Sequence, residues 1–176
     1  MTDTRIQQHS GPSLLGIYLN DHLAGATGGV QLARRLARAH RDSADGDTLG
    51  HLAAEIAKDR AALLGVMAVL SIPVRGYKVF AALIGEKAAR LKLNGHLTGR
   101  SPLSSLIELE MLRLGVEGKA TGWRTLRALA ERDHRLDAAR LDELISEARS
   151  QADVLEELRV RAADRIIGLA RASDRS

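Results

Sequence analysis

The sequence contains no cysteine and very few aromatic residues: one tryptophan, two tyrosines and one phenylalanine among 176 residues. The absence of cysteine excludes a fold stapled by disulfides and any metal site built from thiolates. Because aromatic side chains are scarce, the hydrophobic core must be built mainly from leucine, alanine, isoleucine and valine. Leucine and alanine are strong helix formers. The composition therefore favours an all-α protein.

Long apolar runs are also missing. The longest, residues 61–74 (AALLGVMAVLSIPV), has fourteen residues, fewer than the roughly 18 to 20 that cross a bilayer. The first thirteen residues, MTDTRIQQHSGPS, lack the basic-then-apolar pattern of a signal peptide. We therefore expect a cytoplasmic protein without a membrane segment.

Positive charge is concentrated in one short segment. The net charge is +4, and residues 72–100 alone carry six basic residues and one acidic residue. A basic segment can bind nucleic acid, but a local excess this small is usually a solvated face. The segment offers only Tyr77 and Phe80 for stacking on bases. Nucleic acid is therefore the least favoured partner.

Apolar residues recur at helical spacing in four long stretches and one short one. Ser101-Pro102 is the clearest start signal, a capping hydroxyl before a proline at the first helical position. Asp137 is positioned to cap the last helix, and Leu109, Leu114 and Trp123 are predicted to face inward. The predicted helices span residues 13–40, 48–71, 77–93, 102–132 and 138–170, within a single domain of residues 13–170 between flexible termini, 1–12 and 171–176.

The connection between the second and fourth predicted helices is about 30 residues long. That is too long for a bundle turn, and the segment has its own apolar period at Val79, Leu83 and Leu91. Two hairpins joined by a long connection form the ferritin-like arrangement. We therefore expect a ferritin-like four-helix bundle whose crossover contains a short fifth helix.

Two stretches, YLNDHLAGATGG (residues 18–29) and SPLSSLIELEMLRLGVEGKATGW (residues 101–123), resemble small bacterial ferritin-like bundle proteins that have no assigned activity. The resemblance covers most of the chain. It implies the fold but no reaction.

Ferritin-like bundles that hold two metal ions use a carboxylate from each of two helices and a Glu-x-x-His pair from each of the other two. The only such pair here is Glu131 with His134, which lies beside a predicted turn, where a mid-bundle site cannot be. We therefore expect no metal, no other cofactor and no catalysis.

The predicted crossover divides the polar residues of the long helices into two layers, about twelve residues or ~18 Å apart along the bundle. The first layer consists of Arg34 or Arg35 with Glu55, Glu108 and Asp164. Because an arginine competes with a metal cation for carboxylates, this layer is predicted to be an ion-pair layer. The second layer is the alternative metal site, for iron or manganese: His22, Glu117, Glu147 and Gln151.

The role of His22 distinguishes a structural interior from a metal site in the second layer. A lone inward histidine is more often a hydrogen-bonded core residue than a ligand, and we expect it to face Gln151 on the last helix. The glycines at 25, 28 and 29 weaken the first helix, and close helix approach or a kink around Trp123 would explain them.

These observations predict a non-catalytic bundle of ferritin-like fold, with an absent or degraded metal site. It would act through assembly as a homo-oligomer or through a protein partner. The alternative is a metal-binding carboxylate bundle with oxidase or storage chemistry.

Overall fold

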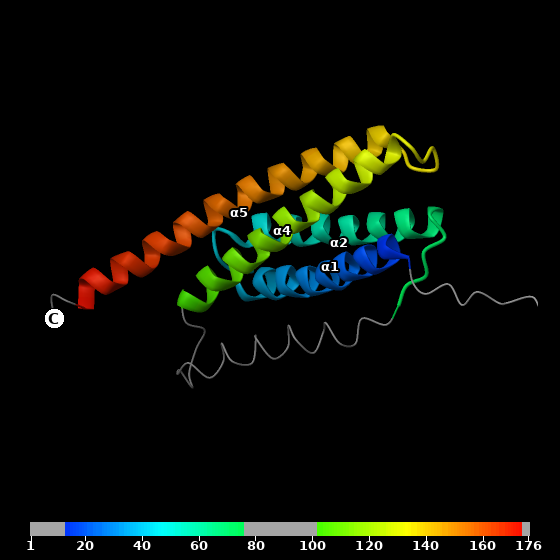
Figure 1. The fold of residues 1–176 in the computed structure, drawn as a ribbon. Helices are drawn as coiled ribbons and strands as arrows, with labels where there is room; N and C mark the ends of the chain where they lie inside the picture. Colours follow the sequence, from blue (N-terminus) through cyan, green and yellow to red (C-terminus); the bar gives the residue numbers. More distant parts are fainter. Residues whose placement is uncertain (1–12, 76–101, 174–176) are drawn as a thin grey trace, which may run out of the picture.

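The computed structural model describes residues 13–75 and 102–173. Within these ranges the fold is all-helical, as predicted (Figure 1). The helices are α1 (Leu14–Ala39), α2 (Gly46–Val69), α4 (Pro102–Ala130) and α5 (Ala138–Ser173). Their bounds lie within three residues of the predicted ones. The predicted helix over 77–93 lies outside the described residues, as do residues 1–12.

Short polar contacts fix where the helices begin. The hydroxyl of Ser13 accepts a hydrogen bond from the backbone N–H of Gly16 at 3.0 Å and caps α1. The carboxylate of Asp137 accepts from the backbone N–H of Arg140 at 3.0 Å and caps α5, as predicted. By contrast, α2 begins at Gly46, two residues earlier than predicted. A Cβ atom at Gly46 would lie 2.8 Å from the carbonyl oxygen of His40, so only glycine fits this turn.

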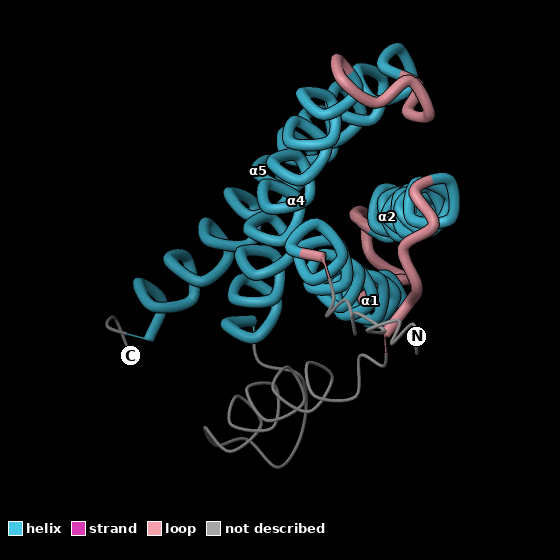
Figure 2. Tube along the Cα trace, turned by 45° about the vertical axis from the view of Figure 1, so that its right-hand side comes forward, coloured by secondary structure: helices cyan, strands magenta, loops and turns pink. Residues whose placement is uncertain are grey.

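The four helices form two antiparallel hairpins, α1–α2 and α4–α5, with α1 packed against α4 (Figure 1). Tyr18 near the start of α1 bonds Thr125 near the end of α4 at 3.1 Å, so these two helices run in opposite directions. Consequently α2 and α4 are parallel. Figure 2, in which α1 and α2 are seen nearly end-on, shows the α4–α5 hairpin inclined across them.

The hydrophobic core lies between the hairpins and draws on all four helices. Among its most buried side chains are Leu19, Leu36, Met67, Leu112, Leu144 and Leu155. Each such side chain contributes about 1.5–3 kcal/mol when removed from water. Leu109 and Trp123 face inward as predicted. The prediction for Leu114 is wrong: its side chain is 70% exposed, because the inward face of α4 passes through Leu112 and Val116 instead.

No helix in the two described ranges combines the length and the apolar character that a membrane span requires.

Candidate functional site

Three polar side chains meet inside the bundle, and we call them the internal lysine cluster: Asp59 of α2, Lys119 of α4 and Gln151 of α5. The ammonium of Lys119 donates to Asp59 Oδ2 and to Gln151 Oε1. Gln151 Nε2 donates to the same Asp59 oxygen at 3.1 Å. The cluster therefore ties three helices together with a closed triangle of hydrogen bonds.

The electrostatics of the cluster follow from its burial. Asp59 and Gln151 are each only 3% exposed. Burial lowers the pKa of the Lys119 ammonium, while the Asp59 carboxylate, and with it Glu55 and Glu147, acts in the opposite direction. A buried charge is tolerated only when paired and hydrogen-bonded. Asp59 and Lys119 therefore depend on one another.

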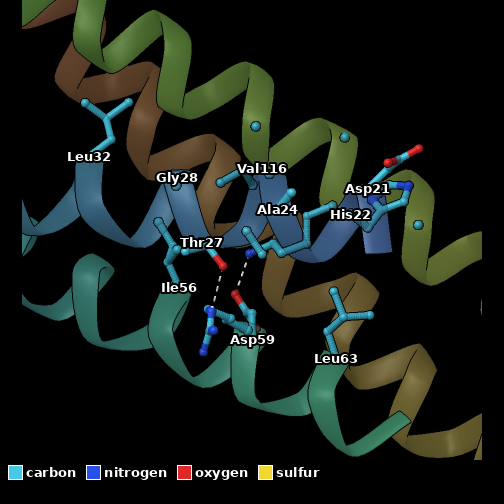
Figure 3. Close-up of a pocket in the computed structure, with 18 of the residues that line it drawn as sticks. Asp21, His22, Ala24, Thr27, Gly28, Leu32, Ile56, Asp59, Leu63 and Val116 are labelled. Carbon is cyan, nitrogen blue, oxygen red and sulfur yellow. Dashed lines mark hydrogen bonds and ion pairs between the residues drawn. The ribbon is translucent and has the colours of Figure 1, made fainter. Parts of the chain in front are cut away.

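A cavity of about 660 Å³ adjoins the cluster between α1, α2 and α4 (Figure 3). Figure 3 shows Thr27 and Asp59 facing one another between α1 and α2, with His22 toward α4. Most of the wall is apolar, with Leu19, Leu32, Ile56, Leu63, Leu112 and Val116 among the lining residues. The volume falls within the ~300–1,000 Å³ of typical small-molecule sites.

Six glycines line this cavity, three on α1 and three on α4: Gly25, Gly28, Gly29, Gly115, Gly118 and Gly122. At Gly122 a Cβ atom would lie 3.0 Å from the ring of His22, so this glycine permits a close approach. At Gly25, Gly29, Gly115 and Gly118, a Cβ atom would meet no described atom within 4 Å. For Gly25 and Gly29, close helix approach, the first of the two predicted explanations, is therefore wrong, because a Cβ atom at either would have no neighbour among the described residues; a kink around Trp123 stays a prediction.

His22 lies on α1 against α4. Its ring packs edge-on against Tyr18, with ring centroids 4.4 Å apart, and over Gly122. Burial lowers the pKa of His22, and the nearby Asp21 carboxylate acts in the opposite direction. The predicted contact between His22 and Gln151 is wrong. α1 packs mainly on α2 and α4, and the amide of Gln151 is engaged with Asp59 and Lys119.

The structure does not bring together the four residues of the alternative metal site. Glu117 and Glu147 are exposed, and Glu147 pairs with Arg140 of its own helix at 3.1 Å. Only Gln151 of the four belongs to the internal lysine cluster. Throughout the described ranges, no three or more His, Asp or Glu side chains are grouped as metal ligands.

The predicted ion-pair layer is reduced to one pair. Glu108 accepts from Arg35 Nη2 at 2.9 Å, so the arginine is Arg35 and not Arg34. Arg34, Glu55 and Asp164 are exposed. The bundle levels are close to those predicted, but helix rotation turns these three side chains outward.

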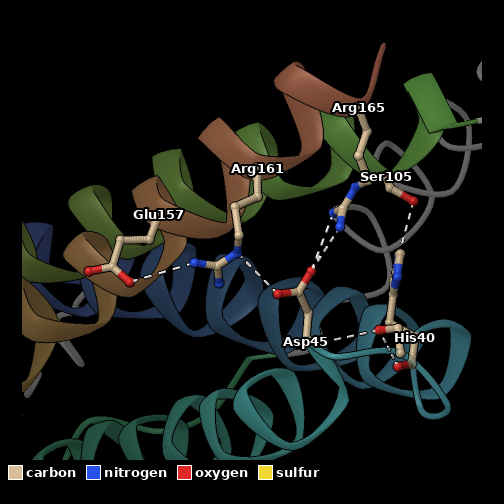
Figure 4. Close-up of polar contacts among 7 residues, drawn as sticks. His40, Asp45, Ser105, Glu157, Arg161 and Arg165 are labelled. Atoms are coloured by element: carbon tan, nitrogen blue, oxygen red, sulfur yellow. Dashed lines mark hydrogen bonds and ion pairs between the residues drawn. The ribbon is translucent and has the colours of Figure 1, made fainter. Parts of the chain in front are cut away.

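A second polar contact joins the hairpins at the α1–α2 turn (Figure 4). The buried carboxylate of Asp45 lies between two arginines of α5, 3.1 Å from Arg161 Nε and 3.2 Å from Arg165 Nη1. Beside it, the ring of His40 bonds the hydroxyl of Ser105 at 3.0 Å. Asp45 could not be predicted from the sequence, since an aspartate in a polar turn gives no sign that it is buried.

No protein-family model, curated protein or solved structure matches this chain.

The lowered pKa of His22 predicts an acid-sensitive step in stability. Above about pH 6.5 the ring is neutral in both the folded and the unfolded chain. As the pH falls below that value, the unfolded chain binds the proton first, so stability is lost toward the lower folded pKa. His22→Gln should therefore flatten the stability curve between about pH 7 and 5, measured by urea unfolding. The exposed His51, changed to glutamine, is the control, and an identical slope in both variants would contradict the assignment.

Proposed function

We propose that this protein is a non-catalytic helical bundle of ferritin-like topology, in which the ammonium of Lys119 occupies the interior in place of a metal ion. It acts by binding a protein partner or by assembling with itself. The topology is supported by the parallel arrangement of α2 and α4 between two antiparallel hairpins, which a long crossover produces.

The observation that carries the proposal is the internal lysine cluster. Metal-binding carboxylate bundles aim acidic and histidine side chains from several helices at one point of the core. Here the side chains that meet at mid-bundle from α2, α4 and α5 are a carboxylate, an ammonium and an amide. The ammonium repels a divalent cation and occupies the Asp59 oxygen that a cation would need.

Partner binding is supported by apolar side chains at one end of the α1–α2 hairpin. Leu14 is 86% exposed, and Ile17 and Val69 are about half exposed. These residues lie where α1 begins and α2 ends. We propose this end of the hairpin as the contact surface, because apolar side chains exposed together are typical of interaction sites.

Metal analysis of protein purified without a chelating tag tests the proposal. After incubation with Fe²⁺ or Mn²⁺ and removal of the excess, the wild-type chain should retain far less than one ion per chain. Lys119→Glu places a carboxylate beside Asp59 and should retain more metal, whereas Lys119→Gln should not. A wild-type chain that holds close to one ion per site would contradict the proposal, and so would equal metal content in the two variants when circular dichroism shows both folded.

A further inference from the structure

We propose that the cavity between α1, α2 and α4 binds a small organic carboxylate with an apolar body, whose carboxylate pairs with Arg60 while the body lies along the glycine-lined walls. This inference goes beyond the proposed function, because it requires neither the missing metal nor a protein partner.

The shape of the cavity depends on glycines that have no steric reason to be glycine. Gly25, Gly29, Gly115 and Gly118 lie in helix interiors, where glycine is less stable than alanine. Gly29 is half-buried and the other three are exposed, and a Cβ atom at any of the four would meet no described atom within 4 Å. Their common effect is to keep about 660 Å³ open beside an apolar wall. An apolar volume of this size fits the body of a small ligand.

The charges around the cavity favour an anionic ligand over a neutral or cationic one. The ammonium of Lys119 is paired with Asp59, and the guanidinium of Arg35 is paired with Glu108. Among the described residues, no carboxylate lies within ion-pair distance of Arg60. A free guanidinium fork binds a carboxylate through two parallel hydrogen bonds.

Arg60 is also held in position to receive that carboxylate. Its Nε donates to Thr27 Oγ1 at 2.9 Å, which leaves the two Nη groups available. The Thr27 hydroxyl is anchored in turn, because it donates to the carbonyl oxygen of Leu23 at 2.8 Å. Asp21, beside His22, precedes Thr27 by six residues, about 9 Å along α1, and repels an anion at that end of the cavity. The carboxylate therefore has one favoured end of the cavity.

The single tryptophan of the chain supplies a direct readout. Trp123 lines the cavity and is 2% exposed. Its indole N–H has no acceptor among the described residues. A bound molecule changes the surroundings of this ring, so that Trp123 fluorescence reports occupancy without a label.

The test compares decanoate with decanol, which share an apolar chain and differ in charge. Titration followed by Trp123 fluorescence should give saturable binding of decanoate, about tenfold or more tighter than decanol. Arg60→Gln should weaken decanoate to the level of decanol and leave decanol unchanged. Gly115→Leu, which adds a side chain to the cavity wall, should abolish both signals, whereas Gly65→Leu, at an equally exposed position that does not line the cavity, should abolish neither.

Three outcomes would overturn the proposal. The first is no saturable change in fluorescence or in melting temperature with decanoate. The second is equal affinity for decanoate and decanol in the wild-type chain, which would show that the cavity recognises apolar surface alone. The third is a dimer in solution that Gly115→Leu converts to a monomer, which would show that a second copy of the chain occupies the cavity. None of these results depends on metal content, so this proposal and the proposed function can fail separately.

Discussion

Lys119→Met should lower the free energy of unfolding by about 3–5 kcal/mol at neutral pH, which is the usual loss when one partner of a buried ion pair is removed. The methionine retains most of the apolar stem of lysine but not the ammonium. The Asp59 carboxylate, 3% exposed, is then left with the amide of Gln151 as its one hydrogen-bond donor among the described residues. Urea unfolding followed by circular dichroism measures the loss.

A triple variant provides the control. In Asp59→Leu/Lys119→Met/Gln151→Leu both charges and the amide that bonds them are gone, and stability should return to near the wild-type value, because apolar side chains of similar volume often replace a buried ion pair without loss. Lys58→Met, on the exposed face of α2, should have almost no effect. A loss below about 1 kcal/mol in the single variant would mean that the pair behaves as a surface salt bridge.

Alanine at Gly25, Gly29, Gly115 and Gly118 together should raise the free energy of unfolding by about 3–4 kcal/mol. The reason is the helix propensity of alanine, roughly 1 kcal/mol per site over glycine, at four positions where its methyl group meets no described atom. For a chain of this size the melting temperature should rise by about 10 °C. Differential scanning calorimetry measures the change.

Gly122→Ala is the matched control for this series. It makes the same substitution on α4, the helix of Gly115 and Gly118, but the new Cβ atom would lie 3.0 Å from the ring of His22. The gain in helix propensity should therefore be cancelled or reversed by crowding. If Gly122→Ala stabilised the chain as much as Gly115→Ala, the close approach of α1 and α4 at this point would be refuted.

The sequence predicted the helices well because their ends depend on neighbours in the chain. Ser13 and Asp137 cap their helices through side chains that reach only three residues ahead. The order of levels along the bundle was also largely predictable from turn positions and the rise per residue. Glu55 was expected level with Glu108, and Glu108 indeed meets an arginine of the predicted layer, Arg35.

Helix rotation and the choice of neighbour could not be predicted in the same way. His22 was placed at nearly the right level but paired with the wrong helix, α5 instead of α4. Lys119 was not identified at all, because charged residues are rarely buried and its two partners come from helices far away in sequence. The cavity was missed for a related reason: glycines on a helix face fit tight packing and empty space equally well. Only the positions of the surrounding atoms distinguish the two.

The contacts that join the two hairpins are distant in sequence, and this bears on the order in which the chain folds. Each hairpin closes through a short turn, whereas Asp59 and Gln151 are 92 residues apart, Tyr18 and Thr125 are 107, and Asp45 and Arg165 are 120. Bringing distant residues together costs more chain entropy than closing a turn. We therefore expect the hairpins to form early and to dock late through these polar contacts. Interactions formed after the transition state act mainly on the rate of unfolding. The Asp45 contact at the α1–α2 turn thus bears on how long the native bundle persists more than on how fast it forms.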